Sequence, residues 1–262
     1  MSMYSTDLNI IAGISDFRLI EDVTKLRALE PKHVRFSDIT PNRYGIRTDK
    51  AFERFIASID KCFLKFKNDD HQQLFLSAFK ENEKIISTEG VLFFHLAIND
   101  RLFSELTINI FIKMYDSGIE IILPDNFLEH LIYLRSSQPT VSKWSDSTIQ
   151  LLASKYLTLL RKLGFLEGKL IKKIRPIYWN DPTLVYFVYL IKAVDIETVN
   201  FLKTPYFPLL FMDKDTFVKR IKDIAKTGIF GITSLGYDLR FDMKYSYKEI
   251  VNAINQHYRS KI

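Results

Sequence analysis

The sequence predicts a mainly α-helical protein, with an N-terminal helical bundle followed by winged-helix elements (a helix-turn-helix plus a β-hairpin). Two observations predict this class. Apolar residues recur at three- and four-residue steps through the first hundred positions, and short β-type runs alternate with helices after Gly118. We expect three domains: a helical bundle over residues 1–98, a winged-helix domain over 99–180, and an α+β domain, reduced winged-helix-like, over 181–262.

The first long helix is predicted to follow Thr48, whose side chain is suited to cap a helix. Its apolar positions are Ala51, Phe52, Phe55, Ile56, Ile59, Phe63 and Phe66. Residues 91–98 are apolar on nearly all sides, which is typical of a helix buried within a bundle. We interpret these aromatic stripes as core packing rather than as a cofactor site, because helical spacing is the ordinary pattern of a buried face.

A helix over residues 101–116 is predicted next, because Asp100 can cap its start and Gly118 can end it. Residues 119–123 then form a short β-type apolar run. This change of pattern marks the beginning of the most informative part of the chain.

Two further helices are predicted over residues 124–135 and 146–163. A Pro-Asp pair is typical of the first turn of the shorter helix. The longer helix follows a dense cluster of capping residues, in which Ser147 and Gln150 have capping-box spacing, and it ends at Gly164.

Residues 165–178 are predicted to form a hairpin whose returning strand spans 170–178. The order helix, strand, helix, helix, hairpin is that of a winged helix, which presents one helix to a DNA groove and the hairpin, or wing, to the backbone. Strict alternation of side chains along the returning strand would place apolar and basic side chains on the same face of the hairpin. We therefore expect an irregular wing and do not assign its residues to faces. The candidate nucleic-acid-binding residues are Gln150, Ser154, Lys155, Thr158, Arg161 and Lys162 on the third helix and Lys169, Lys172, Lys173 and Arg175 in the wing.

The last eighty residues contain helices and a second hairpin. A helix is predicted after Asn180, and a basic helix capped by Asp213 or Asp215 leads into a hairpin over 229–243 that turns around Gly236. A Ser-Tyr-Lys-Glu capping box precedes the final helix. Helix followed by hairpin resembles a second, reduced winged-helix motif.

The net charge of +6 is unevenly distributed along the chain. Residues 1–139 contain 17 basic and 20 acidic side chains, whereas residues 140–262 contain 20 and 11, so the two parts have charges of −3 and +9. This asymmetry predicts that the C-terminal half faces a polyanion, while the acidic helical half is the better candidate for protein contacts.

Several classes of protein lack their characteristic residues here. The single cysteine, Cys62, lies in an apolar helical pattern and fits a buried thiol in a reducing compartment. The first residues lack the features of a signal peptide, and no uncharged run is long enough to span a membrane. The five histidines have no metal-ligand spacing. We therefore expect a cytoplasmic protein with no metal and no membrane contact.

No catalytic motif is convincing. The sequence has no GxxxxGK[ST], GxGxxG, HExxH or CxxC pattern, so we expect no cofactor, no small-molecule substrate and no enzymatic activity. Asp125, Glu167 and Lys169 match the loose PD…ExK pattern of metal-dependent nucleases. That pattern needs its second carboxylate and lysine on a central strand, whereas Gly168 is predicted to form a hairpin turn, so we do not assign this function.

The segment from about Leu74 to Gly168 resembles the BrxA family of bacterial BREX phage-defence systems. The most telling part is Trp-Ser-Asp-Ser-Thr at 144–148, followed by a long helix into Leu-Gly-Phe-Leu-Glu at 163–167. The resemblance implies a helical bundle joined to winged-helix elements, non-enzymatic DNA binding, and partners among the larger BREX proteins: a methyltransferase, a P-loop ATPase and a phosphatase-like protein.

These observations together predict a DNA-binding accessory protein of a phage-defence system, which contacts the phosphates of double-stranded DNA through the winged helix. The alternative is a protein-interaction scaffold whose winged helices contact other defence components without binding nucleic acid. RNA binding through the helical bundle is a third possibility, ranked lower because no aromatic RNA-binding signature is present.

Overall fold

The computed structural model describes residues 4–29, 39, 44–80, 85–235 and 238–259. The chain forms two compact units: unit 1 comprises Met1–Lys65 and Leu92–Ile177, and unit 2 comprises Phe66–Val91 and Tyr178–Ile262. Each unit is therefore assembled from two stretches that are separated in the sequence. The boundary at residues 91 and 92 falls inside one helix, α5 (Thr88–Asn99).

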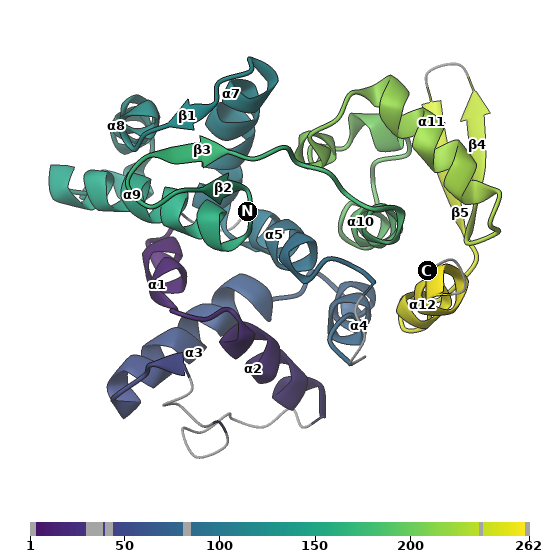
Figure 1. Ribbon diagram of the computed structural model, residues 1–262, viewed down its shortest axis with the longest axis horizontal. Helices are drawn as coiled ribbons and strands as arrows, with labels where there is room; N and C mark the ends of the chain where they lie inside the picture. The colour runs from purple at the N-terminus through teal and green to yellow at the C-terminus, as the bar shows by residue number, and fades with distance from the viewer. Residues whose placement is uncertain (1–3, 30–38, 40–43, 81–84, 236–237, 260–262) are drawn as a thin grey trace. The chain divides into compact units, whose positions relative to one another are not determined.

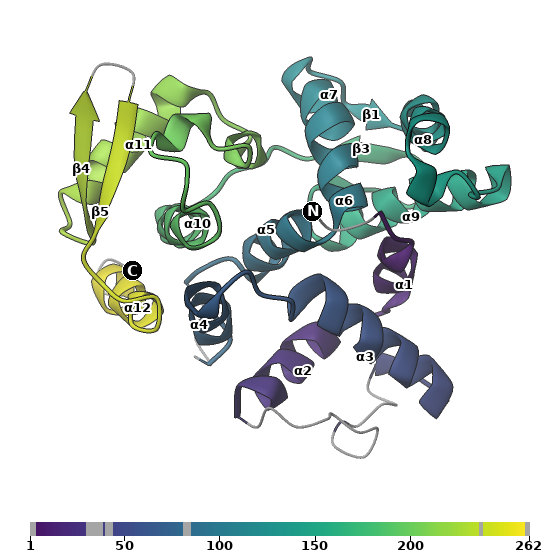
Figure 2. The same ribbon diagram turned by 180° about the vertical axis from the view of Figure 1, so that it is seen from behind.

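Unit 1 begins with three helices, α1 (Asp7–Gly13), α2 (Arg18–Leu29) and α3 (Asp49–Phe63). Thr48 caps α3 as predicted, because its hydroxyl accepts a hydrogen bond from the Ala51 N–H at 3.2 Å. The apolar side of α3, including Phe52 and Ile59, is buried, so the stripe is core. Helix α1 packs against both α3 and α9 (Figure 1 and Figure 2).

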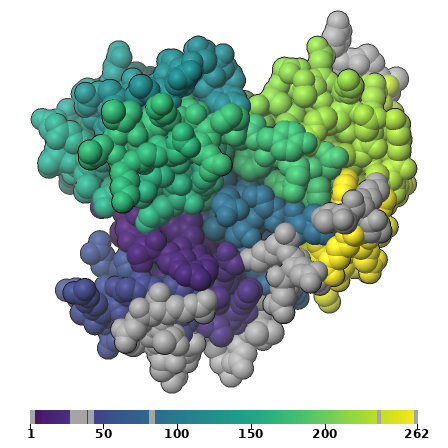
Figure 3. All heavy atoms as spheres, viewed as in Figure 1, coloured from purple at the N-terminus to yellow at the C-terminus, as the bar shows by residue number. Residues whose placement is uncertain are grey.

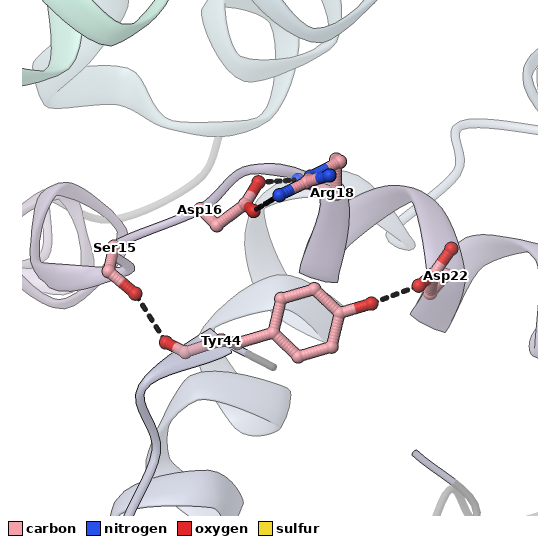
Figure 4. Close-up of polar contacts among 5 residues, drawn as sticks. All are labelled: Ser15, Asp16, Arg18, Asp22 and Tyr44. Carbon is pink, nitrogen blue, oxygen red and sulfur yellow. Dashed lines mark hydrogen bonds and ion pairs between the residues drawn. The ribbon is translucent and has the colours of Figure 1, made fainter. Parts of the chain in front are cut away.

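A polar cluster at the start of α2 holds the segment before α3 in place (Figure 4). The Ser15 hydroxyl donates to the backbone carbonyl of Tyr44, and the buried Tyr44 hydroxyl donates to the Asp22 carboxylate. Asp16 accepts hydrogen bonds from the Arg18 backbone N–H at 2.9 Å and from its Nε at 2.7 Å. These contacts fix the turn between α1 and α2.

The centre of unit 1 is a buried helical segment. Every residue from Leu92 to Asp100 is buried, as predicted for a helix within a bundle. Helix α6 (Arg101–Leu106) follows and continues through a five-residue π-helical stretch, η3 (Thr107–Phe111), into α7 (Ile112–Asp116). Gly118, in the left-handed region with φ +71°, ends this helical segment as predicted.

The rest of unit 1 combines two helices with a small sheet. Its elements are β1 (Ile121–Ile122), α8 (Asp125–Ser137), the 3₁₀ turn η4 (Pro139–Val141), α9 (Asp146–Lys162), β2 (Leu166–Glu167) and β3 (Lys172–Ile174). The sheet is antiparallel with the order β1-β3-β2. Ile122 and Leu166 are buried, whereas Ile121, Glu167 and Lys173, which are paired across the strands, are exposed.

Unit 2 has a central helix, α10, that is buried on nearly all sides. Asn180 caps α10 and Asp213 caps α11, accepting hydrogen bonds from the N–H groups of Thr183 at 2.9 Å and Thr216 at 2.8 Å, as predicted. The other predicted hairpin is present as a two-stranded antiparallel sheet, although Gly236 in its turn lies outside the described residues. The elements are α4 (Asp69–Ser77), α10 (Asp181–Val194), the 3₁₀ turns η5 (Phe201–Lys203) and η6 (Phe207–Leu210), α11 (Lys214–Ala225), β4 (Phe230–Leu235), β5 (Asp238–Met243) and α12 (Ile250–Arg259).

The predicted mainly α class is confirmed, with two small antiparallel sheets. Within the predicted cluster of capping residues, Ser145 is the cap of α9, because its Oγ accepts the Thr148 N–H at 3.2 Å. One local prediction is wrong. The returning strand is only β3, because Pro176 has no N–H to donate and the Ile177 N–H bonds to the Tyr115 hydroxyl at 3.3 Å. Among the described helices, none combines the length and apolar character needed to cross a membrane.

Candidate nucleic-acid interface

The orientation of α9 is fixed by its buried side. Tyr156 is fully buried, and its ring contacts Phe103 and Phe127 with centroid distances of 5.6 Å and 4.9 Å. Its hydroxyl shares a hydrogen bond of 2.9 Å with Thr107 in the π-helical stretch, so the buried polar atom has a partner. Burial of Tyr156 therefore fixes the rotation of α9 about its own axis, and the opposite side of the helix faces outward.

The start of α9 is tied to the preceding helix. Arg135 in the last turn of α8 makes an ion pair with Asp146 at 2.7 Å and also donates to the carbonyl oxygen of Trp144 at 3.2 Å. Together with the Ser145 cap, these bonds hold the connection between α8 and α9 in one conformation. The cation Arg135 is thereby compensated within the protein.

The six predicted site residues of α9 fall into two groups. Gln150, Ser154 and Arg161 are exposed, and they follow one another at intervals of four and seven residues along one side of the helix. Lys155, Thr158 and Lys162 are half-buried and spaced at three and four residues. This second group includes the lysines that face α1, so the predicted surface is not a single open face.

Lys162 is engaged within unit 1. Its Nζ donates to the carbonyl oxygen of Ala12 at 2.9 Å and to that of Ile14, and it lies 5.5 Å from the centre of the Phe17 ring. It thus satisfies carbonyl groups at the end of α1. Burial, with the neighbouring cations Lys155 and Arg161, lowers the pKa of Lys162 to about 8.

The predicted wing is a short hairpin with a tight turn at Gly168, whose φ is +85°. A Cβ at this position would lie 2.1 Å from the backbone oxygen of Ile171, so only glycine fits. Lys169, Lys173 and Arg175 are exposed, whereas Lys172 is half-buried. The β2–β3 region, drawn in green, is open to solvent on the face of unit 1 seen in Figure 3.

The basic residues of this element have no acidic partners among the described residues. Within the described part of the chain, no ion pair involves Lys155, Arg161 or the four cations of the wing. Residues 140–177 contain eight basic and two acidic side chains, a charge of +6 that equals the net charge of the whole chain. The surplus inferred from the sequence is therefore concentrated on α9 and the hairpin.

Exposed apolar side chains beside these cations were not predicted as part of the site. Leu170 and Ile171 at the tip of the hairpin are 95% and 60% exposed, and Ile121 in β1 and its neighbours Ile119 and Leu123 are also exposed. The apolar run at 119–123 was the available signal, because only one side of a strand can face the core, and here Ile122 alone is buried. A surface with both basic and apolar groups results.

The nuclease-like pattern is divided among different elements. Asp125 is the first residue of α8 and Glu167 lies in β2, next to the Gly168 turn. Among the described residues, no group of three or more His, Cys, Asp or Glu side chains is arranged to hold a metal ion.

These features define a mainly helical protein with an uncompensated basic helix and hairpin in unit 1. Residues 61–187 match the model of the BrxA family. This match supports assignment of the chain to the BrxA family and suggests a protein associated with BREX defence.

A similar solved structure supports the fold. The crystal structure of an uncharacterized protein from Magnetospirillum magneticum matches 74% of this chain and 98% of its own, with a TM-score of 0.50 and 12% sequence identity. At this identity the similarity concerns the fold alone. A comparison with curated proteins gave no match.

Proposed function

We propose that this protein is a non-enzymatic DNA-binding accessory of a BREX-type phage-defence system. In this proposal α6–α7, α8, α9 and the sheet β1-β3-β2 form a winged helix that contacts the phosphates of double-stranded DNA. The observation that supports it best is the +6 charge of residues 140–177, which has no acidic partners among the described residues.

The connectivity also supports this assignment. In a winged helix, the strand between the first two helices pairs with the returning strand of the wing, and here β1 pairs with β3. The helix α9 precedes the wing directly and so occupies the position of the recognition helix. Its capped, ion-paired start at Ser145 and Asp146 provides the rigid connection that such a helix needs.

The contacts to DNA are assigned to the exposed members of the predicted set. Gln150 and Ser154 have the hydrogen-bonding groups to reach bases or phosphates, and Arg161 supplies a cation on the same side of α9. In the wing, the exposed cations are Lys169, Lys173 and Arg175. Lys162 is excluded as a principal contact because its ammonium group already bonds to α1.

The salt dependence of duplex binding tests this assignment. Each phosphate contact contributes roughly 0.9 to the slope of log K against log salt concentration. Replacing Lys169, Lys173 and Arg175 together by Gln is expected to reduce that slope by about 2.7 and to weaken binding to unrelated duplex sequences equally. Fluorescence anisotropy with two duplexes at several salt concentrations measures both quantities.

The matched control replaces Arg47, Lys50 and Lys65 by Gln, which removes the same net charge from exposed positions of unit 1 outside the proposed interface. The slope of log K against log salt concentration for this variant is expected to equal that of the parent, apart from a small change caused by its lower net charge. Equal slopes for the wing variant and the parent would refute the proposed interface.

A second function is favoured by the exposed apolar residues. Ile121 lies on β1, which pairs with the basic strand β3, and the exposed Ile119 and Leu123 flank that strand. Exposed apolar groups of this kind occur at protein interfaces. The alternative is therefore a scaffold that binds other BREX components, such as the methyltransferase, the P-loop ATPase or the phosphatase-like protein. Replacing Ile121 by Ser is expected to abolish co-purification with such a partner while leaving duplex affinity unchanged.

A further inference from the structure

A small cavity lies between α1, α3 and α9 in unit 1, with a volume of about 200 Å³. Asn9, Ile10 and Gly13 from α1, Ala51, Arg54 and Phe55 from α3, and Lys155 from α9 line it. The pocket is partly open to solvent, because Gly13 and Arg54 are exposed and the other lining residues are half-buried.

Two cationic residues, Arg54 of α3 and Lys155 of α9, are part of the pocket lining. In the portion of the chain that the structure describes, neither Arg54 nor Lys155 has a hydrogen bond or an ion pair. Lys155 is also close enough to Lys162 to act on its titration, which places a third positive group nearby. The side-chain amide of Asn9 adds a neutral hydrogen-bond donor to the lining.

The remaining walls are apolar. Ile10, Ala51 and Phe55 supply hydrocarbon and an aromatic ring, and Gly13 leaves the space that a side chain would occupy. A ligand that fits this lining has an anionic end and a compact apolar body. Arginine and lysine together favour phosphate as the anion, because guanidinium forms paired hydrogen bonds with phosphate oxygens.

We propose that the cavity between α1, α3 and α9 binds a small phosphate monoester whose organic group packs against Ile10 and Phe55, while Arg54 and Lys155 hold the phosphate. The site shares α9 with the proposed DNA interface, but it uses the half-buried Lys155 rather than the exposed Gln150, Ser154 and Arg161. A backbone phosphate of DNA shares this chemistry, so the experiment must distinguish a free ester from the DNA backbone.

Phenyl phosphate is a suitable probe, because it combines a phosphate with an aromatic body. Calorimetry with the full chain is expected to detect binding, and phenol, which lacks the phosphate, is expected not to bind. Arg54→Gln and Lys155→Gln should each lower the affinity for phenyl phosphate by about tenfold, the usual effect of losing one charge-assisted hydrogen bond. Lys65→Gln, an exposed change at the end of the α3 segment, should bind as the parent does.

Gly13→Ala tests the shape of the site without altering charge. Its new methyl group would lie 3.7 Å from the Phe55 ring, an ordinary contact, so the fold should tolerate it while the cavity becomes smaller. Binding of phenyl phosphate should fall more than binding of inorganic phosphate. Unfolding curves for all four variants identify any that are misfolded.

Three results would overturn the proposal: no binding of phenyl phosphate by the parent at millimolar concentration, parent-like binding by both Arg54→Gln and Lys155→Gln, or displacement of phenyl phosphate by duplex DNA. The last result would assign the anion site to the DNA backbone instead. Simultaneous binding of phenyl phosphate and duplex supports the free ester. Because duplex affinity is measured separately, failure of this site and failure of the DNA-binding proposal are distinguishable.

Discussion

At the scale of single residues, Asp100 combines a local role with an electrostatic cost. It caps α6 by accepting the Phe103 N–H at 2.8 Å, yet its carboxyl group is completely buried. Burial raises the pKa of Asp100 to about 6, against the opposing effect of the hydrogen bond from Phe103. The same position is thus favourable for helix initiation and unfavourable for a charge.

The pH dependence of stability should reveal this cost. The folded pKa is about 6 and the ordinary value is 3.8, so folding favours the protonated carboxyl and stability falls as pH rises through this interval. Asp100→Asn retains a good capping residue and removes the titration. We expect the variant to match the parent near pH 4 and to exceed its free energy of unfolding at pH 7 by about 2–3 kcal/mol.

Urea denaturation of both proteins at a series of pH values measures this difference. Asp22→Asn is a control for the loss of a negative charge elsewhere in unit 1, at a carboxylate that accepts the Tyr44 hydroxyl. If the difference between Asp100→Asn and the parent stayed constant from pH 4 to pH 7, the carboxyl would not titrate in this interval.

At the scale of elements, the hairpin of β2 and β3 depends on one backbone conformation. Gly168 has φ +85° and approaches the Ile171 oxygen so closely that a side chain would collide with it. The Ile174 N–H then bonds to the Glu120 oxygen at 2.8 Å, and the Arg175 N–H to the Phe165 oxygen at 2.9 Å. The placement of the basic side chains therefore follows from this turn.

Replacing Gly168 by Ala should loosen the hairpin locally. We expect a cost of about 1–3 kcal/mol, from the strained φ and from the collision. Gly118→Ala is the matched control, because its φ is +71° but no atom lies within 4 Å of the new methyl group. Hydrogen exchange at the Ile174 and Arg175 amides should accelerate in Gly168→Ala alone; equal protection in both variants would contradict this account.

Many starts and ends of the helices could be predicted from the sequence, because helix caps and terminating glycines are local signals. Thr48, Asp100 and Asn180 were predicted as caps and Gly118 as a helix end, since each has its partners within a few residues. For α9 the sequence narrows the cap to the cluster from Ser145 to Thr148, and the structure identifies Ser145 within it. The engagement of Lys162 was not predictable, because its carbonyl partners are about 150 residues away in the sequence.

At the scale of the whole molecule, two compact units share one chain. Hydrophobic periodicity identifies helices but does not reveal that residues 66–91 belong with 178–262, since this depends on contacts such as that of α4 with α10. Each unit has its own buried aromatic residues, including Phe103 and Tyr156 in unit 1 and Tyr189 and Phe217 in unit 2.

Separate cores predict separate unfolding transitions. The two tryptophans fall in different units, Trp144 in unit 1 and Trp179 in unit 2, so each reports on one unit. In urea, fluorescence of Trp144→Phe should follow unit 2 and that of Trp179→Phe should follow unit 1, with different midpoints. Circular dichroism of the parent should show both unfolding transitions. Coincident midpoints in all three measurements would show that the two units unfold together.

The interrupted arrangement of unit 2 also sets an order of events during synthesis. Leu74, Phe75 and Phe79 leave the ribosome early, yet they are buried in a unit that includes α10, which is translated roughly 100 residues later. At about 5–20 residues per second, these side chains wait on the order of 5–20 s for their partners. The nascent chain therefore passes through a period in which unit 1 can complete its fold while an apolar segment of unit 2 stays accessible to chaperones.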